Sequence, residues 1–178
     1  MKFRILLAFL IMFSLSNKVM SKDNTTLYDF SFEDIDGNQV KLEKFAGKPI
    51  LMVNTASRCG YTPQYGNLQN LFLEYKDSDL TIIATTSNSF YQEYEEVDDI
   101  KKICLVNYDV GFVTSSPMEV KGKNAHPIYS WIESTYNKKP KWNFFKFLFD
   151  RNGYLVDSWS SMTKPDSSKI TKQIDKLI

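Results

Sequence analysis

The sequence predicts an α/β fold in which a mixed central sheet carries helices on both faces. Two unbroken apolar segments, residues 50–53 and 80–84, flank an amphipathic helical segment. This order implies a right-handed crossover between two parallel, buried strands. Turn residues at Asp36-Gly37 and at 150–153 separate further extended segments, so a β-hairpin is expected near each end of the domain.

Each element follows from its hydrophobic period and its boundary residues. Thr62 and Pro63 are typical of a helix N-cap and first helical position, and apolar residues then recur at helical spacing. The predicted strands are residues 25–32, 39–42, 50–53, 80–84, 143–149 and 154–158, with a short extended piece at 118–120. The predicted helices are residues 62–76, 98–108, 127–136 and 165–177.

The N-terminus is typical of a secretory signal peptide. Lys2 and Arg4 precede an apolar run at residues 5–15, which is shorter than the roughly 20 residues that a membrane span needs. We therefore predict a signal peptide at 1–21, an exposed segment at 22–26 and one domain at 27–178. The mature protein is expected to be exported, to the periplasm or the medium, and an uncleaved anchor is the alternative.

Composition excludes several classes of function. The 22 Lys and Arg residues nearly balance 21 Asp and Glu residues, so there is no electrostatic case for binding nucleic acid. The only histidine, His126, lacks the partners that a metal site or histidine-based catalysis requires. We assign His126 a structural role and expect no metal or bound cofactor.

Two cysteines, Cys59 and Cys104, are the candidates for chemistry. Cys59 lies in a bend between the strand at 50–53 and the following helix, where free backbone N–H groups and the helix dipole favour a nucleophilic thiolate. Cys104 lies on the apolar face of the next helix. The alternatives are a cysteine that only packs and, in an oxidising compartment, a structural disulfide between the two.

Three blocks of sequence resemble the glutathione peroxidase family. Residues 53–62, Val-Asn-Thr-Ala-Ser-Arg-Cys-Gly-Tyr-Thr, resemble its active-site signature. Residues 125–129, Ala-His-Pro-Ile-Tyr, and residues 142–148, Trp-Asn-Phe-Phe-Lys-Phe-Leu, resemble two further family blocks in the right order. The resemblance extends from about Leu27 to the C-terminus and implies a thioredoxin-like fold.

The resemblance implies a thiol peroxidase that reduces hydrogen peroxide and organic hydroperoxides. Cys59 would attack the O–O bond and become a sulfenic acid. Trp142 and Asn143 match the family residues whose N–H groups surround that sulfur and stabilise negative charge there. Packing alone is the alternative for Trp142, whereas Asn143 is unusual in a predicted strand.

Cys104 occupies the position at which thioredoxin-dependent members keep their resolving cysteine. It would form a disulfide with oxidised Cys59, which a thioredoxin-like protein would then reduce. Glutathione is the other possible reductant. We favour this cycling disulfide over a static one, and the family precedent requires partial unwinding of the helix.

The main departure from the family pattern is Ser89, which stands where a glutamine donor is expected. The loss of this donor is expected to slow attack by a factor on the order of ten or more, unless Gln92 compensates. Val113 replaces a proline, with only local consequences expected. Because Ser89 differs, a redox relay with slow peroxide turnover is a second hypothesis, and an exported domain with a static Cys59–Cys104 disulfide is a third.

The loop at 137–141 is shorter than the corresponding insertion of tetrameric members. Its length predicts a monomer with an open active-site surface that accepts bulky hydroperoxides and a protein reductant. Exposed side chains among Phe144, Phe145 and Phe147 are expected to help bind membrane lipid hydroperoxides, with alternate members of the run in the core.

Overall fold

The computed structural model describes residues 24–178, so the predicted signal peptide lies outside the described residues. Its main sheet has five strands in the order β5-β4-β3-β6-β7. These strands are β3 (Ile50–Thr55), β4 (Thr81–Thr86), β5 (Val113–Thr114), β6 (Lys146–Phe149) and β7 (Leu155–Trp159). A separate hairpin pairs β1 (Ser31–Glu33) with β2 (Gln39–Lys41).

The sheet is mixed, as the sequence predicts. β3 pairs in parallel with β4, and β4 with β5, whereas β6 and β7 are antiparallel to their neighbours. All six residues of β3 are buried because this strand is the centre of the sheet, and this burial accounts for its unbroken apolar start. Its carboxyl end therefore lies in the middle of one edge of the sheet, where loops from several elements converge.

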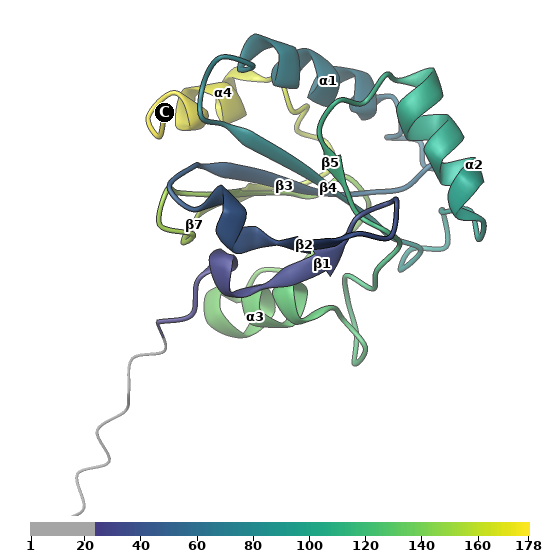
Figure 1. Ribbon diagram of the computed structural model, residues 1–178, viewed down its shortest axis with the longest axis horizontal. Coiled ribbons are helices and arrows are strands. Elements are labelled where there is room, and N and C mark those ends of the chain that lie inside the picture. Colours follow the sequence, from purple (N-terminus) through teal and green to yellow (C-terminus); the bar gives the residue numbers. More distant parts are fainter. Residues whose placement is uncertain (1–23) are drawn as a thin grey trace, which may run out of the picture.

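Helices cover both faces of the sheet (Figure 1). On one face lie α1 (Gln64–Glu74), α2 (Val97–Lys101) and α4 (Ser168–Ile174), and on the other lie α3 (Pro127–Tyr136) and the β1-β2 hairpin. Each face has its own buried cluster. The first cluster includes Leu68, Ile100 and Ile170, and the second includes Phe32 and Ile132.

The α/β sandwich is confirmed, but several predicted boundaries are wrong. The fifth strand is β5, not the extended piece at 118–120, because Thr114 pairs with Ala84 of β4. β6 begins at Lys146 rather than at 143, so Asn143 lies in a turn and not in a strand. The last helix begins at Ser168 rather than at 165. Local composition did not distinguish a turn from a strand end at these places.

The second helix changes its hydrogen-bonding pattern halfway along. After α2, residues Lys102–Asn107 form a π-helix, which we call the π segment, and Cys104 lies within it. A π-helical turn inside a helix is uncommon and is often found at functional sites. The apolar spacing that predicts an ordinary helix at 98–108 does not distinguish the two, since both bury Ile100 and Cys104.

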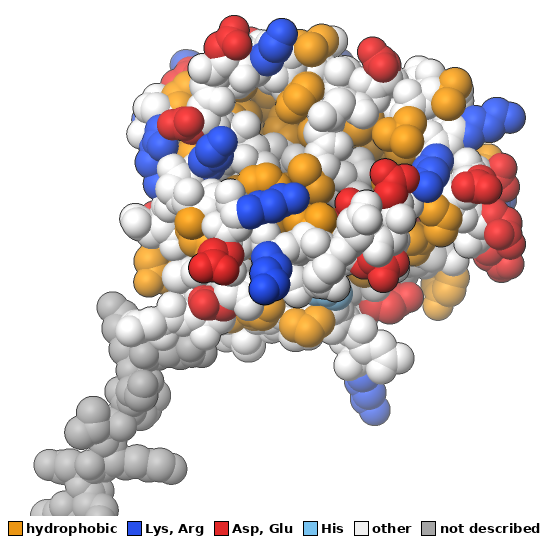
Figure 2. Space-filling view, in the orientation of Figure 1, with side chains coloured by type: hydrophobic (Ala, Val, Ile, Leu, Met, Phe, Trp, Pro, Cys, Tyr) orange, Lys and Arg blue, Asp and Glu red, His pale blue; other side chains and the backbone are white. Residues whose placement is uncertain are grey.

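Charges of both signs are spread over the face seen in Figure 2, and acidic side chains gather at the edge where α2 lies. The exposed acids of this edge include Glu95, Glu96, Asp98 and Asp99. Among residues 24–178 there is no helix long and apolar enough to cross a membrane.

Candidate active site

Cys59 is held in a tight turn between β3 and α1. Its backbone N–H donates to Thr62 Oγ1 (3.0 Å), and that hydroxyl donates to Ala56 O (2.8 Å). The Tyr61 N–H points at Cys59 Sγ, at 3.4 Å. The sulfur thus faces a backbone N–H group, the contact that the sequence predicts for this bend. The Cys59 side chain is shielded, since the residue is only 6% exposed.

Thr62 therefore has a different role from the predicted one. α1 begins at Gln64 with Pro63 as its N-cap, and no side chain caps it. The Thr62 hydroxyl instead bridges two backbone groups of the Cys59 turn. The expected N-cap is thus wrong, and Thr62 is a residue that shapes the turn.

The end of β3 also positions the second block of candidate residues. The Asn54 side chain donates to Trp142 O (3.1 Å) and accepts from the Phe145 N–H (3.0 Å). Asn54 is fully buried and directly precedes Thr55, the last residue of the strand. Because these bonds hold the loop before β6 against β3, Trp142 and Asn143 lie beside the strand that leads into the cysteine turn.

Asn143 and Gln92 form a polar pair next to that turn. Asn143 is fully buried, and its Nδ2 donates to Gln92 Oε1 (3.1 Å). The Gln92 backbone carbonyl accepts from the Arg58 N–H (2.9 Å), one residue before the cysteine. Trp142 is 42% exposed and packs against Phe90, with ring centroids 5.2 Å apart. The structure thus brings Cys59, Asn143 and Gln92 into one connected region.

Ser89 lies in a different hydrogen-bond network. Its hydroxyl donates to Glu119 Oε2 (2.5 Å) and accepts from the Val120 N–H (2.9 Å) and from Ser87 Oγ (2.9 Å). A hydroxyl has one hydrogen, and here Glu119 receives it. Ser89 consequently holds the loop at 119–120, and Gln92 is the side chain of this segment that contacts Asn143.

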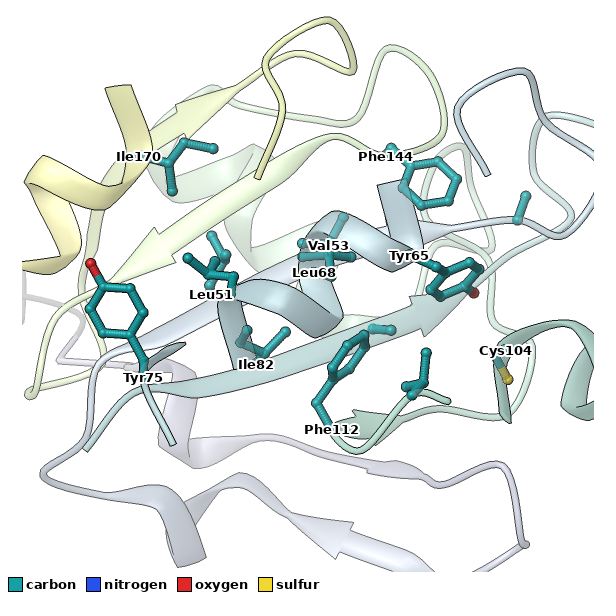
Figure 3. Close-up of a cluster of buried hydrophobic side chains, with 14 of the residues drawn as sticks. Leu51, Val53, Tyr65, Leu68, Tyr75, Ile82, Cys104, Phe112, Phe144 and Ile170 are labelled. Carbon is teal, nitrogen blue, oxygen red and sulfur yellow. The ribbon is translucent and has the colours of Figure 1, made fainter. Parts of the chain in front are cut away.

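Cys104 is fully buried in the core cluster drawn in Figure 3, and Cys59 belongs to the same cluster. Both thiols are free in the structure. Burial, together with the negative charge of Glu93, raises the pKa of Cys104 to about 11. Cys104 is therefore a protonated, unreactive thiol in the folded, reduced protein.

A buried lysine is connected to Asn143 through a chain of hydrogen bonds. Lys146 Nζ donates to Gln64 Oε1 and to Thr163 O (2.7 Å). Gln64 Nε2 donates to Ser161 O (2.6 Å), and Ser161 Oγ donates to Asn143 O (2.5 Å). Burial lowers the pKa of Lys146 to about 7. The chain of bonds connects the first turn of α1 with the backbone of Asn143.

Three residues of this region carried only weak signals in the sequence. Gln92 lies in a loop of uncertain alignment, and Glu93 lies in an acidic run that resembles a solvated surface, although it is 3% exposed. Lys146 is a cation inside the apolar run of β6, and this position was the one available sign of a buried polar network.

His126 has the structural role that the sequence predicts. It precedes α3, and its Nδ1 accepts from the Ile128 N–H (3.4 Å). Burial lowers the pKa of its imidazole. Within residues 24–178, no group of three or more His, Cys, Asp or Glu side chains could hold a metal ion.

The expected exposure of the phenylalanine run is wrong. Phe144 and Phe147 are fully buried and Phe145 is 8% exposed, because their side chains enter both core clusters. Phe144 reaches the first cluster with a positive φ of 61°, a strained conformation for a bulky residue. None of the three can bind a lipid at the surface, so Trp142 is the exposed aromatic side chain of this block.

Comparisons with known proteins agree with this fold. A sequence profile of the glutathione peroxidase family matches residues 27–133. The chain is 39% identical over 158 residues to "Glutathione peroxidase homolog BsaA" of Staphylococcus epidermidis, covering 86% of this chain and 99% of the relative. It is also 39% identical over 166 residues to "Hydroperoxy fatty acid reductase gpx1" of Synechocystis sp., covering 87% and 97%.

Solved structures place the fold in the same class. The crystal structure of Trgpx in its apo form aligns with a TM-score of 0.69 and 30% identity, over 86% of this chain and 95% of that one. A thiol:disulfide interchange protein of the thioredoxin family from Chlorobium tepidum aligns with a TM-score of 0.63. At 15% identity, over 84% of this chain and 95% of that one, it shows the fold alone.

The fold is thus thioredoxin-like, with a cysteine turn at the carboxyl end of its central strand. The chain belongs to the glutathione peroxidase family, and its enzymatic class is that of a peroxidase. The predicted family and fold are both confirmed.

Proposed function

We propose that this protein reduces hydrogen peroxide and organic hydroperoxides with Cys59 as the peroxidatic residue. The Cys59 turn is the observation that carries the proposal, because a backbone N–H donates to Sγ and the Asn143–Gln92 pair adjoins it. The thiolate attacks one peroxide oxygen, the O–O bond breaks, and a proton converts the leaving oxygen to water or an alcohol. Cys59 leaves this step as a sulfenic acid.

Cys104 is the resolving residue in this proposal. Its thiol displaces the hydroxyl of the Cys59 sulfenic acid, so that a disulfide forms and water leaves. The two residues share a core cluster, and the π segment that carries Cys104 supplies a non-standard helical turn that can open. A thioredoxin-like dithiol protein then reduces the disulfide, with glutathione as the alternative reductant.

Steady-state peroxide consumption tests the assignment. Wild type is compared with Cys59→Ser and Cys104→Ser, each with a thioredoxin system and with glutathione. Cys59→Ser is expected to abolish turnover with both reductants, and Cys104→Ser to abolish it with thioredoxin only. If Cys59→Ser consumes peroxide as fast as wild type, Cys59 is not the peroxidatic residue.

A redox relay is the second candidate, and the position of Ser89 favours it. The Ser89 hydrogen is committed to Glu119, so the site has one side-chain donor fewer than the family pattern. A relay would react slowly with peroxide and form a stable mixed disulfide with one partner protein. Fast turnover in the assay above rules this function out.

We further propose export, monomeric assembly and activity on lipid hydroperoxides. Export rests on the basic and apolar pattern of the N-terminal residues, and the monomer rests on the short loop at 137–141. The name of the Synechocystis relative supports a hydroperoxy fatty acid as one substrate. N-terminal sequencing of the exported fraction, sedimentation of the purified protein and turnover with a fatty acid hydroperoxide test these three points.

A further inference from the structure

A buried carboxylate is attached to the cysteine turn. Glu93 Oε1 and Oε2 both accept from the Ser57 N–H at 3.1 Å, and Oε1 also accepts from the Tyr94 N–H at 2.9 Å. Ser57 is two residues before Cys59, so these bonds hold Glu93 to the cysteine turn and not to the π segment. The hydrogen bonds leave Oε2 with a free lone pair.

Several buried polar groups in this part of the protein have no hydrogen-bond partner within the described chain. Thr55 Oγ1, Ser57 Oγ and Tyr65 OH are buried, and none has a hydrogen-bond partner among residues 24–178. Leaving a buried polar group unpaired costs about 1–3 kcal/mol, and such groups in native proteins call for an explanation.

Cys104 adjoins this polar region. Tyr65 and Cys104 lie at the same end of the core cluster in Figure 3, and both belong to it. Burial is the main cause that raises the pKa of Tyr65, and the charges of Cys104 and Glu93 add to it. Glu93 is thus hydrogen-bonded to the turn that holds Cys59, which Cys104 must reach to form the disulfide, and its negative charge acts on Cys104.

The resolving step needs a proton acceptor. With its pKa near 11, Cys104 is a thiolate in about one molecule in ten thousand at pH 7. Only the thiolate attacks the sulfenic sulfur. Burial raises the pKa of Glu93, which brings this carboxyl closer to the range in which it can exchange protons at neutral pH.

We propose that Glu93 removes the proton from Cys104 as this residue attacks the Cys59 sulfenic acid. This inference rests on the proposed function and adds a general base to it. The freed electron pair of Cys104 Sγ forms the S–S bond, and the S–O bond of Cys59 breaks. The leaving hydroxide takes the proton back from Glu93, so that one water leaves and the carboxylate is restored. Cys104 is oxidised, and the sulfenic sulfur of Cys59 is reduced to the disulfide level.

Other charged groups near Glu93 are solvent-facing. A cavity of about 380 Å³ lies on its outer side and connects it with water. The charged residues that line this cavity with it are Arg58, Glu95, Glu96 and Asp99. Lys101 acts on Cys104 and is bound to Asp36 at 2.8 Å. Glu93 is the only buried carboxylate among residues 24–178, which distinguishes it from these acids.

Rapid mixing of the reduced protein with one equivalent of hydrogen peroxide separates the two steps. Samples are quenched over time, and mass spectrometry counts the trapped sulfenic acid and the disulfide. The proteins are wild type, Glu93→Gln, Glu93→Asp and the exposed control Glu95→Gln. Cys104→Ser defines the signal of a sulfenic acid that no resolving thiol removes.

Glu93→Gln is expected to slow disulfide formation at pH 7 by about 100-fold relative to its own sulfenic acid formation, a typical contribution of a general base. Its resolution rate should rise tenfold per pH unit between pH 7 and 9, whereas wild type, Glu93→Asp and Glu95→Gln stay nearly flat. Parallel pH profiles for wild type and Glu93→Gln overturn the proposal.

The wild-type profile decides the matter if Glu93→Gln does not fold. A wild-type resolution rate that itself rises tenfold per pH unit above pH 7 contradicts a role for Glu93, and a flat profile supports it. If wild type forms no sulfenic acid at all, the proposed function fails, and this outcome is distinct from both.

Discussion

Two neighbouring polar side chains, Ser89 and Gln92, differ in what they contact. Gln92 accepts from Asn143 and touches the cysteine turn through its carbonyl, whereas Ser89 binds Glu119 and the Val120 N–H. The loop between Ser89 and Gln92 is short, and it places Gln92 within hydrogen-bond distance of Asn143. Gln92 is therefore the residue that we expect to compensate for the family's missing glutamine.

This difference separates two variants. Gln92→Ala should slow the oxidation of Cys59 by peroxide about tenfold or more, because Asn143 loses its partner and the site loses an amide. Ser89→Ala should leave that rate within about twofold and lower the free energy of unfolding by about 1–3 kcal/mol, because Val120 N–H and Glu119 lose a buried partner. Stopped-flow oxidation and urea unfolding measure the two effects. The opposite pattern would place Ser89 in the site.

At the scale of single elements, α1 follows the cysteine turn and packs against the chain that follows the second helix. Gly66 lies in α1, and a Cβ built on it would lie 3.8 Å from Tyr108 Cδ1, an ordinary contact. Gly111 follows the π segment closely, and a Cβ there would lie 2.8 Å from Phe72 Cε1 of α1. The packing between α1 and the chain after the π segment is thus too tight for a Cβ at Gly111 and leaves room for one at Gly66.

Alanine at these two glycines should change stability in opposite directions. Gly66→Ala is expected to raise the free energy of unfolding by about 0.4–1 kcal/mol, because alanine restricts the unfolded chain and suits a helix. Gly111→Ala is expected to lower it by about 1–3 kcal/mol, because the Phe72 ring must shift. Urea unfolding of both variants checks the pair, and equal signs would contradict the described packing.

At the scale of the whole molecule, the most unusual feature is a lysine buried beneath the site. Lys146 contacts Gln64 and Thr163 and is fully buried in β6. Its pKa in the folded state is about 7, whereas an unfolded lysine has a value of about 10.4. Between these values the unfolded chain binds more protons than the folded one, so the free energy of unfolding rises with pH across this window.

Lys146→Met isolates this contribution. Between pH 7 and 9 the unfolding free energy of wild type should rise relative to that of Lys146→Met, by up to about 1.4 kcal/mol per pH unit. Urea denaturation at several pH values gives both curves. Parallel curves would mean that Lys146 stays protonated in the folded protein.

The sequence by itself determined the order of elements, the place of Cys59 and the family. Unbroken apolar runs, turn residues and the three motif blocks are local signals, and they suffice to put a cysteine at the end of a central parallel strand. These local signals gave wrong predictions in three places, because pairing partners and burial depend on distant segments. The three are the helix boundary at Thr62, the strand at 118–120 and the exposure of Phe144 and Phe147.

Only the tertiary structure decided which polar groups meet. A hydrogen bond requires donor and acceptor about 3 Å apart, and loops far apart in the sequence set that distance. Gln92 is hydrogen-bonded to Asn143, which lies 51 residues away in the sequence, whereas Ser89 is hydrogen-bonded to Glu119. Glu93 lies in the interior beside Ser57 because two backbone N–H groups, those of Ser57 and Tyr94, compensate for its burial. The sequence thus suffices to propose Cys59 as the nucleophile, whereas the polar groups around it could not be predicted.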